Sequence, residues 1–308
     1  MKNNSPKTVI LVTGPTASGK TAVAIQLALA YKTEIISADS RQCFREMSIG
    51  VARPSVTELA TVAHHFIASH SIHEDVTAAT FEAYALSKVD ELFQQHDHVI
   101  MVGGTGLYIK AFCEGLDLIP EIDPIIRQQV IQAYEEKGMA WLQQAIKEQD
   151  PDFFASGEIK NPQRCIRALE VCQSTGKSIL EYRTGRKAMR NFRVIKIGLE
   201  LPKEILHHQI HQRVEQMILA GLEDEVRSLY PYRQLNALQT VGYSELFDFI
   251  DGKITREQAI DAIKTHTRQY AKRQLTWFRK DPGISWFSPN DWEGLLSFLK
   301  QQSDTFTR

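Results

Sequence analysis

The sequence predicts an α/β fold, in which a parallel sheet flanked by helices carries an inserted all-helical domain. Three observations predict it. Apolar strands alternate with helical spacing over the first 115 residues, the region that follows is helical in pattern, and a strand pattern then returns. Strands that alternate with helices form parallel sheets with right-handed crossovers. We therefore expect a core of residues 1–119 and 191–308, with C-terminal helices, interrupted by a helical insertion of residues 120–190.

The N-terminal part supplies the predicted sheet. Short apolar runs end in turn residues, which is typical of buried parallel strands. The predicted elements, in order, are a strand over 8–12, a helix over 22–31, a strand over 34–38, a helix over 78–94 and a strand over 98–102.

The insertion and the C-terminal part follow. Pro120 and Pro124 break the periodicity and mark the boundary. Asn161-Pro162 can open a helix over 163–174 that ends at Gly176. A strand is expected over 194–199, and the chain from residue 203 onward is mostly helical in pattern.

One motif lies between the first strand and the first helix. It matches the pattern G-x-x-x-x-G-K-S/T, and its residues are Gly14, Pro15, Thr16, Ala17, Ser18, Gly19, Lys20 and Thr21. Backbone N–H groups of such a loop and the following helix N-terminus bind anions. This phosphate-binding loop predicts a P-loop NTPase-like sheet and a bound di- or triphosphate.

The ends of the next two strands carry the other candidate groups. Asp39 follows the second strand and Gly103-Gly104 follows the third, so both should meet the phosphate-binding loop at the carboxyl edge of the sheet. The third strand ends without the acid that usually helps to hold magnesium in phosphoryl-transfer enzymes, which weakens the ATPase and GTPase hypotheses. Asp39 itself fits either a helix N-cap or a metal ligand or general base.

Composition and charge restrict the partners. The net charge is −1 and 43% of the residues are hydrophobic, as in ordinary globular proteins. No apolar run reaches the roughly 20 residues of a membrane helix, so we expect a cytoplasmic protein with no membrane partner. We also expect it to be a monomer. Basic residues gather in two segments: 160–196 has ten Lys or Arg and two acids, and 264–280 has six and none. Such segments bind polyanions or form solvated faces.

Taken together, the motifs resemble those of the bacterial tRNA dimethylallyltransferases, the tRNA isopentenyltransferase family. The resemblance covers roughly residues 8 to 288 in the same order. Besides the phosphate-binding loop, it is carried by Ile36 to Gln42 (ISADSRQ), Gly103 to Tyr108 (GGTGLY), Gln163 to Glu170 (QRCIRALE), Gly221 to Val226 (GLEDEV), Val241 to Tyr243 (VGY) and Thr267 to Arg279 (TRQYAKRQLTWFR).

The resemblance implies an enzyme that transfers a dimethylallyl group from dimethylallyl diphosphate to tRNA. The acceptor would be the exocyclic N6 amine of the adenosine 3′ of the anticodon (position 37), in tRNAs that read codons beginning with U. The phosphate-binding loop would hold the donor diphosphate, with Lys20 neutralising it, Mg²⁺ at Thr21 and Arg213 beside it. Asp39 would be the general base, and Thr105 would lie where diphosphate and target base meet.

The resemblance also implies a set of tRNA contacts. The anticodon stem-loop would be bound by Asp39, Ser40, Arg41, Gln42, Thr105, Arg127, Gln163, Arg164, Cys165, Ile166 and Arg167. Arg164 and Arg167 are three apart, so a helix would present both on one face. The target adenine must be flipped out of its stack to react. We expect Trp277 and Phe278 to pack in the core rather than to stack on a base.

The chain departs from the family pattern at several positions. Ala68 stands where an acid is usual, Gln209 replaces an arginine four residues before Arg213, and Cys43-Phe44 replaces Val-Tyr. His64 and His65 are not expected to bind a metal. Other activities considered are an adenylate isopentenyltransferase, a small-molecule kinase with a phosphate-binding loop, and a non-enzymatic tRNA-binding module. The helical insertion favours a macromolecular acceptor.

Overall fold

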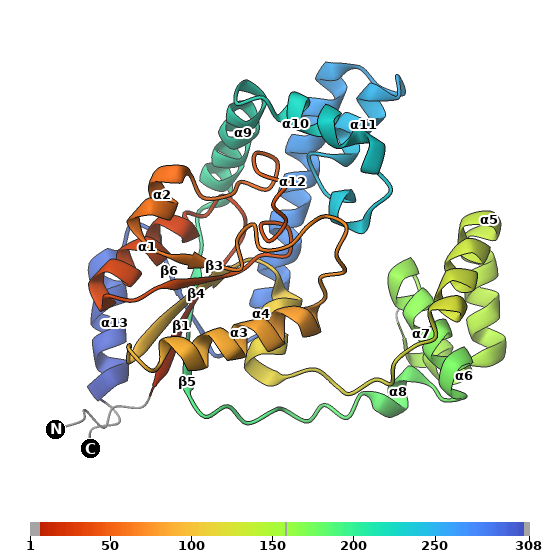
Figure 1. Ribbon diagram of the computed structural model, residues 1–308, viewed down its shortest axis with the longest axis horizontal. Helices are drawn as coiled ribbons and strands as arrows, with labels where there is room; N and C mark the ends of the chain where they lie inside the picture. Colours follow the sequence, from red (N-terminus) through yellow and green to blue (C-terminus); the bar gives the residue numbers. More distant parts are fainter. Residues whose placement is uncertain (1–6, 158, 305–308) are drawn as a thin grey trace. The chain divides into compact units, whose positions relative to one another are not determined.

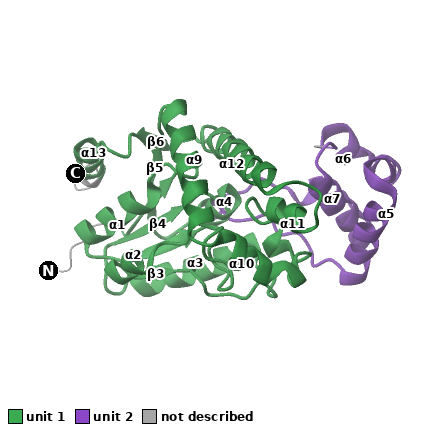
Figure 2. Cartoon of the chain, turned by 90° about the horizontal axis from the view of Figure 1, so that it is seen from above, with its two compact units in different colours: residues 1–113, 189–308 green, residues 114–188 purple. Residues whose placement is uncertain are grey.

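The computed structural model describes residues 7–157 and 159–304, and its chain divides into two compact units (Figure 2). The first unit contains a parallel sheet of six strands in the order β3-β2-β4-β1-β5-β6, which confirms the α/β prediction. The strands are β1 Thr8–Thr13, β2 Ile35–Ala38, β3 His64–His65, β4 His98–Gly103, β5 Arg193–Leu199 and β6 Ile284–Phe287.

Two of these strands were missed in the sequence. β3 has only two residues, and β6 is a short strand with a polar residue inside it, so neither produces an alternating pattern long enough to read. Both are edge strands of the sheet, held by β2 and β5. Their pairing is decided by the neighbouring strand rather than by their own sequence.

The helices of the first unit cover both faces of the sheet (Figure 1). Successive residues of β1 point to opposite faces, as in any strand. Val9 and Leu11 belong to an apolar cluster with α3, α4 and residues of α9 to α12, whereas Ile10 and Val12 belong to one with α1 and α13. The helices are α1 Lys20–Tyr31, α2 Val56–Thr61, α3 Ala78–Leu92, α4 Gly106–Glu114, α9 Lys203–Leu219, α10 Leu222–Leu229, α11 Ser244–Ile250, α12 Arg256–Phe278 and α13 Trp292–Asp304, with short 3₁₀ turns η1 Tyr230–Tyr232 and η2 Asn236–Leu238.

The second unit, residues 114–188, contains helices and no strand in its described part. Its helices are α5 Pro124–Gln149, α6 Pro151–Ser156, α7 Pro162–Thr175 and α8 Ile179–Tyr182. α5 is interrupted at Gly138, whose φ of 73° is non-helical. Asn161 caps α7 and Gly176 ends it in a left-handed conformation, as the sequence predicts. The unit has an apolar core of its own.

The boundaries of this unit differ from the expected 120–190. The Ala188 amide donates to the Glu114 carbonyl, the Lys187 ammonium pairs with the Glu114 carboxylate, and the Thr184 hydroxyl donates to Asp117. The two segments that connect the units therefore hydrogen-bond to each other, and residues 114–119 belong to the insertion. Within 7–157 and 159–304, no helix combines the length and apolar character that crossing a membrane requires.

Candidate active site

The phosphate-binding loop leaves β1 through a tight backbone approach. Gly14 has a φ of 143°, and a Cβ there would lie 2.5 Å from the Leu199 carbonyl oxygen of β5. Gly19, also at positive φ, precedes the first turn of α1, and no described side chain caps that turn. The amides at this helix start therefore remain available to an anion, and the helix dipole favours negative charge there.

Cationic and polar side chains complete this anion site. The Lys20 ammonium donates to the Pro15 carbonyl (2.6 Å), and an Arg213 guanidinium nitrogen donates to the Thr16 hydroxyl (3.3 Å). The Ser18 hydroxyl is buried and has no hydrogen-bond partner within the described residues, which fits a hydroxyl that a bound phosphate would satisfy. Arg213 was predicted here, and the structure places it here.

Burial changes the charge of Lys20. Desolvation first and the nearby Arg213 charge second lower the pKa of its ammonium to about 7, while the Asp39 carboxylate acts in the opposite direction. Burial also lowers the pKa of Arg213. The anion site therefore holds less positive charge at neutral pH than two basic residues would carry in water, and a bound anion would restore it.

Asp39 lies at the end of β2, where a turn follows rather than the helix that an N-cap would begin. One carboxylate oxygen accepts from the Arg41 amide (2.9 Å) and the Gln42 amide (3.2 Å), so it caps the turn. Within the described residues the other oxygen accepts no hydrogen bond, so it is open to a substrate. Thr105 lies beside this turn: its hydroxyl accepts from the Ser40 amide at 3.0 Å and donates to the Ser40 hydroxyl.

The absence of an acid after β4 has a steric cause. A Cβ at Gly103 would lie 2.2 Å from the carbonyl oxygen of Ala38, and one at Gly104 would lie 2.2 Å from the Gln274 amide nitrogen. The end of β4 and the turn after it therefore carry glycine, because β2 and α12 approach the backbone there. The acid at this edge of the sheet is instead Asp39, after β2.

Sequence reasoning missed two residues of α12 at this site. Gln274 donates to the Gly104 carbonyl (2.9 Å) and accepts from the Thr16 amide (2.7 Å), so it ties the phosphate-binding loop to the turn after β4. Burial, together with the Asp39 charge, raises the pKa of Tyr270 to about 12. Both residues belong to the segment 267–279, and their four-residue spacing, which puts them on one helix face, was the available signal.

Residues 16–21 of the phosphate-binding loop, Asp39, Gly103 and Gly104 line one cavity of about 800 Å³ in the first unit, as expected, whereas Thr105 is not among the lining residues. Its polar part includes Thr16, Ser18, Gly19, Lys20, Thr21, Asp39, Gln42, Arg213, Tyr270 and Gln274, and its apolar part includes Ile49, Val51, Pro54, Val56, Leu59, Ile67 and Met217. A second cavity of about 490 Å³ shares Tyr270 with the first and is lined by polar and charged residues that include Ser40, Arg41 and Arg273. The Asp39 turn thus borders two cavities.

Comparison with known proteins agrees with this site. A family model described as IPP transferase matches residues 42–281. The chain belongs to the IPP transferase family. It is 51% identical over 279 residues to a tRNA dimethylallyltransferase of Christiangramia forsetii (91% of this chain, 92% of the relative), and 47% identical over 294 residues to one of Cytophaga hutchinsonii (96% and 97%).

Solved structures show the same relationship. The full-length tRNA isopentenylpyrophosphate transferase from Bacillus halodurans superposes with a TM-score of 0.70 at 33% identity, covering 96% of this chain and 95% of that one. A eukaryotic dimethylallyltransferase acting on tRNA gives a TM-score of 0.77 at 25% identity, covering 93% and 75%. The fold of this IPP transferase family member is thus that of its relatives.

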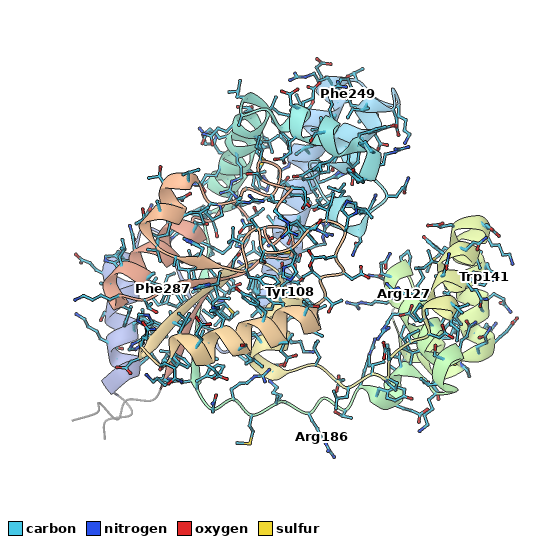
Figure 3. The ribbon with its side chains drawn as sticks, in the orientation of Figure 1. Tyr108, Arg127, Trp141, Arg186, Phe249 and Phe287 are labelled. Carbon is cyan, nitrogen blue, oxygen red and sulfur yellow. The ribbon has the colours of Figure 1, made fainter. Side chains whose placement is uncertain are left out.

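The remaining predicted tRNA contacts lie in the second unit. Arg127 (labelled in Figure 3) and Arg167 both pair with Glu170, a fully buried carboxylate, at 3.0 and 2.6 Å. Both arginines keep part of their side chains exposed. Cys165 and Ile166 are buried in the core of the unit, because they lie on the inner face of α7. Their side chains face away from solvent, and contact with RNA stays a prediction for Gln163 and the arginines.

The two basic segments are less positive in the fold than in the sequence. Acids from elsewhere in the chain pair with Lys187, Arg190, Lys264 and Arg279, and these acids are Glu114, Glu82, Glu215 and Glu200 respectively. Part of each segment is therefore neutralised within its own unit, and fewer charges remain for a polyanion.

The residues that depart from the family pattern lie in the loops and core around the cavity or outside its lining. Ala68 has a left-handed φ of 49° and its amide donates to the Gln42 carbonyl. Cys43 and Phe44 are buried, so they fill the core rather than the cavity. Gln209 is not among the residues that line the 800 Å³ cavity.

The aromatic prediction is partly right. Phe278 is buried as expected, but Trp277 is 40% exposed and packs against the backbone at Gly106. His65 contacts the Glu34 carboxylate, and the His64 ring bonds to the backbone. Among the described residues no group of three or more His, Cys, Asp or Glu could hold a metal.

Proposed function

We propose that this chain is a tRNA dimethylallyltransferase. It transfers a dimethylallyl group from dimethylallyl diphosphate to the N6 amine of the adenosine next to the anticodon, in tRNAs that read codons beginning with U. The observation that carries the proposal is the shared cavity, which is lined by the residues of the anion site, by the Asp39 carboxylate with its open oxygen, and by apolar side chains. Family membership and the names of the relatives support the same reaction.

The anion site suits the leaving group. When the carbon–oxygen bond of the donor breaks, negative charge grows on diphosphate. The amides of the phosphate-binding loop, the unpartnered Ser18 hydroxyl, Lys20 and Arg213 are the groups that would stabilise that charge. Donors held in advance at the place where charge develops stabilise the transition state more than the ground state.

The residues present also fit a magnesium ion. Mg²⁺ prefers oxygen ligands and usually takes few from the protein when a substrate phosphate supplies the rest. Thr21 lines the cavity directly after Lys20, and we assign its hydroxyl as the protein ligand. When bound, the ion would neutralise charge on the departing diphosphate.

Asp39 accounts for the proton. The adenine N6 forms a bond to the donor carbon as the carbon–oxygen bond breaks, and the amine must lose one proton. The backbone amides of Arg41 and Gln42 fix one oxygen of the carboxylate, so the other is oriented without needing a second side chain. Diphosphate leaves with the electron pair of the broken bond, and Asp39 takes the proton.

The body of the acceptor tRNA binds outside this cavity, and only the target adenine enters it. The adenine must leave its stack to reach Asp39, and an anticodon loop allows that at low cost. Ser40, Arg41 and Gln42 border the site, and Gln163, Arg164 and Arg127 belong to the helical unit assigned to the tRNA. We expect the enzyme to act as a monomer in the cytoplasm, where its tRNA substrate resides.

One assay tests the proposal. The protein is incubated with dimethylallyl diphosphate, Mg²⁺ and unmodified tRNA, and the nucleosides are analysed by mass spectrometry. Prenylated adenosine at position 37 is the expected product. Product formed only with AMP would instead indicate an adenylate isopentenyltransferase, and a phosphorylated product with ATP would indicate a kinase. Either result would overturn the assignment.

A further inference from the structure

One carboxylate of the first unit holds a loop of the cavity wall. The two oxygens of Glu225, in α10, accept from three successive amides, those of Ser48 (3.0 Å), Ile49 (2.8 Å) and Gly50 (3.0 Å). Successive amides that converge in this way form an anion-binding concavity. Here the anion is internal, so its effect is to fix the conformation of the loop.

Tyr243 completes this arrangement. Its hydroxyl donates to Glu225 at 2.5 Å, and its ring is fully buried beneath the loop. A Cβ at Gly50 would lie 2.5 Å from the ring, so the loop backbone rests directly on it. Burial raises the pKa of the Tyr243 hydroxyl, with the Glu225 charge adding to it, so the hydroxyl stays protonated as a donor. The segments 221–226 and 241–243, both part of the family resemblance, thus converge on one loop.

The loop needs such anchors. Ala52 adopts a left-handed φ of 48°, which residues with a Cβ rarely populate. From the other side, the Gln42 side-chain amide donates to the carbonyls of Val51 (3.2 Å) and Ala52 (3.0 Å). Gln42 belongs to the Asp39 turn. The loop is therefore held by hydrogen bonds on two sides, from Gln42 of the Asp39 turn and to Glu225.

Side chains of this loop contribute to the apolar lining of the cavity. Ile49 and Val51 line the cavity together with Met217 of α9, and all three also pack against the core, so they are only partly exposed. Met217 lies one helical turn beyond Arg213, which contacts the phosphate-binding loop. The apolar wall thus begins next to the place assigned to the diphosphate.

We propose that Glu225 and Tyr243 are positioning residues for the prenyl group of the donor. Through the loop they set the place of Ile49 and Val51, and these, with Met217, form a wall that accepts a five-carbon chain and excludes a longer one. This inference rests on the proposed function, because it assigns the chain that the wall contacts. It predicts that the pair affects binding of the prenyl group but not of diphosphate.

The test compares Glu225→Gln and Tyr243→Phe with the wild type. Dissociation constants are measured for inorganic diphosphate and for dimethylallyl diphosphate, both with Mg²⁺, and kcat/KM is measured for dimethylallyl and geranyl diphosphate. We expect Glu225→Gln to lower the affinity for dimethylallyl diphosphate about tenfold, which is the scale of a misplaced apolar contact. The affinity for inorganic diphosphate should stay within about twofold of the wild-type value. The preference for the shorter donor should fall by a similar factor, and Tyr243→Phe should show the same pattern more weakly.

Glu223→Gln is the matched control. Glu223 lies in the same helix and pairs with Arg227 and Arg256 without contacting the loop, so its variant should leave both affinities unchanged. If Glu225→Gln fails to fold, Ile49→Ala tests the wall itself and should increase the use of geranyl diphosphate.

Two outcomes would overturn the inference. In a folded Glu225→Gln variant, the affinities for diphosphate and for dimethylallyl diphosphate could fall equally, or neither could fall. Failure of the proposed function would look different, because the wild type would then bind dimethylallyl diphosphate no better than diphosphate and would leave tRNA unmodified.

Discussion

Replacing Lys20 by Met should abolish a proton uptake that accompanies binding of dimethylallyl diphosphate. Burial and the Arg213 charge lower the pKa of Lys20 to about 7 in the ligand-free site. At pH 8.5 its ammonium is then about 97% deprotonated. A bound diphosphate should return the pKa to near the ordinary value of about 10.4, so binding takes up about 0.95 proton. The donor itself contributes little, since the last phosphate pKa is about 6.

The sign of the pH dependence follows. Above pH 7 the affinity for the donor should fall, approaching tenfold per pH unit, because a proton must be bound together with the ligand. Below pH 7 this group should contribute no dependence. The ligand-free protein should gain stability as pH rises from about 7 towards 10.4, because over that window the unfolded chain holds a proton that the folded chain lacks.

Calorimetric titration at pH 8.5 in two buffers of different ionisation enthalpy measures the uptake directly. The wild type should take up about one proton and Lys20→Met close to none. Arg213→Gln should give an intermediate value, because the loss of its charge raises the Lys20 pKa. An uptake below about 0.3 proton in the wild type, or equal uptake in Lys20→Met, would refute the reasoning.

Three further predictions concern positioning and charge. Asp39→Asn keeps an oxygen for the two turn amides but loses the base, so kcat should fall about 10²–10⁴-fold with tRNA affinity nearly unchanged; normal turnover would exclude the base role. Gln274→Leu should lower the free energy of unfolding by about 2–4 kcal/mol and weaken diphosphate binding, because it removes both bonds between the phosphate-binding loop and the turn after β4. Scanning calorimetry measures the stability and titration calorimetry the affinity, and wild-type values of both would contradict the prediction. Glu170→Gln should lower the melting temperature and the affinity for tRNA, because it leaves Arg127 and Arg167 without their buried charged partner. A thermal melt measures the first and filter binding the second, and no change in either would contradict the prediction.

The sequence by itself determined the fold class and the position of the chemistry. The phosphate-binding loop and the Asp39 turn are local motifs, whose hydrogen bonds join residues a few positions apart. Strand alternation then required their meeting at one edge of a parallel sheet. The helix over 162–175 and its caps were equally readable, because capping residues act within a single turn.

The tertiary structure alone decided what surrounds those motifs. Gln274 bonds to Thr16 across 258 residues, and Glu225 reaches the loop at 48–50 across about 175. The sequence spacing of such partners carries no signal, because contacts of this range are set by packing of whole elements. The lowered pKa of Lys20 is also a tertiary property, since it depends on how much water the folded chain removes from the ammonium. The local motifs fix which groups react, and the fold fixes their charge, their orientation and the wall beside them.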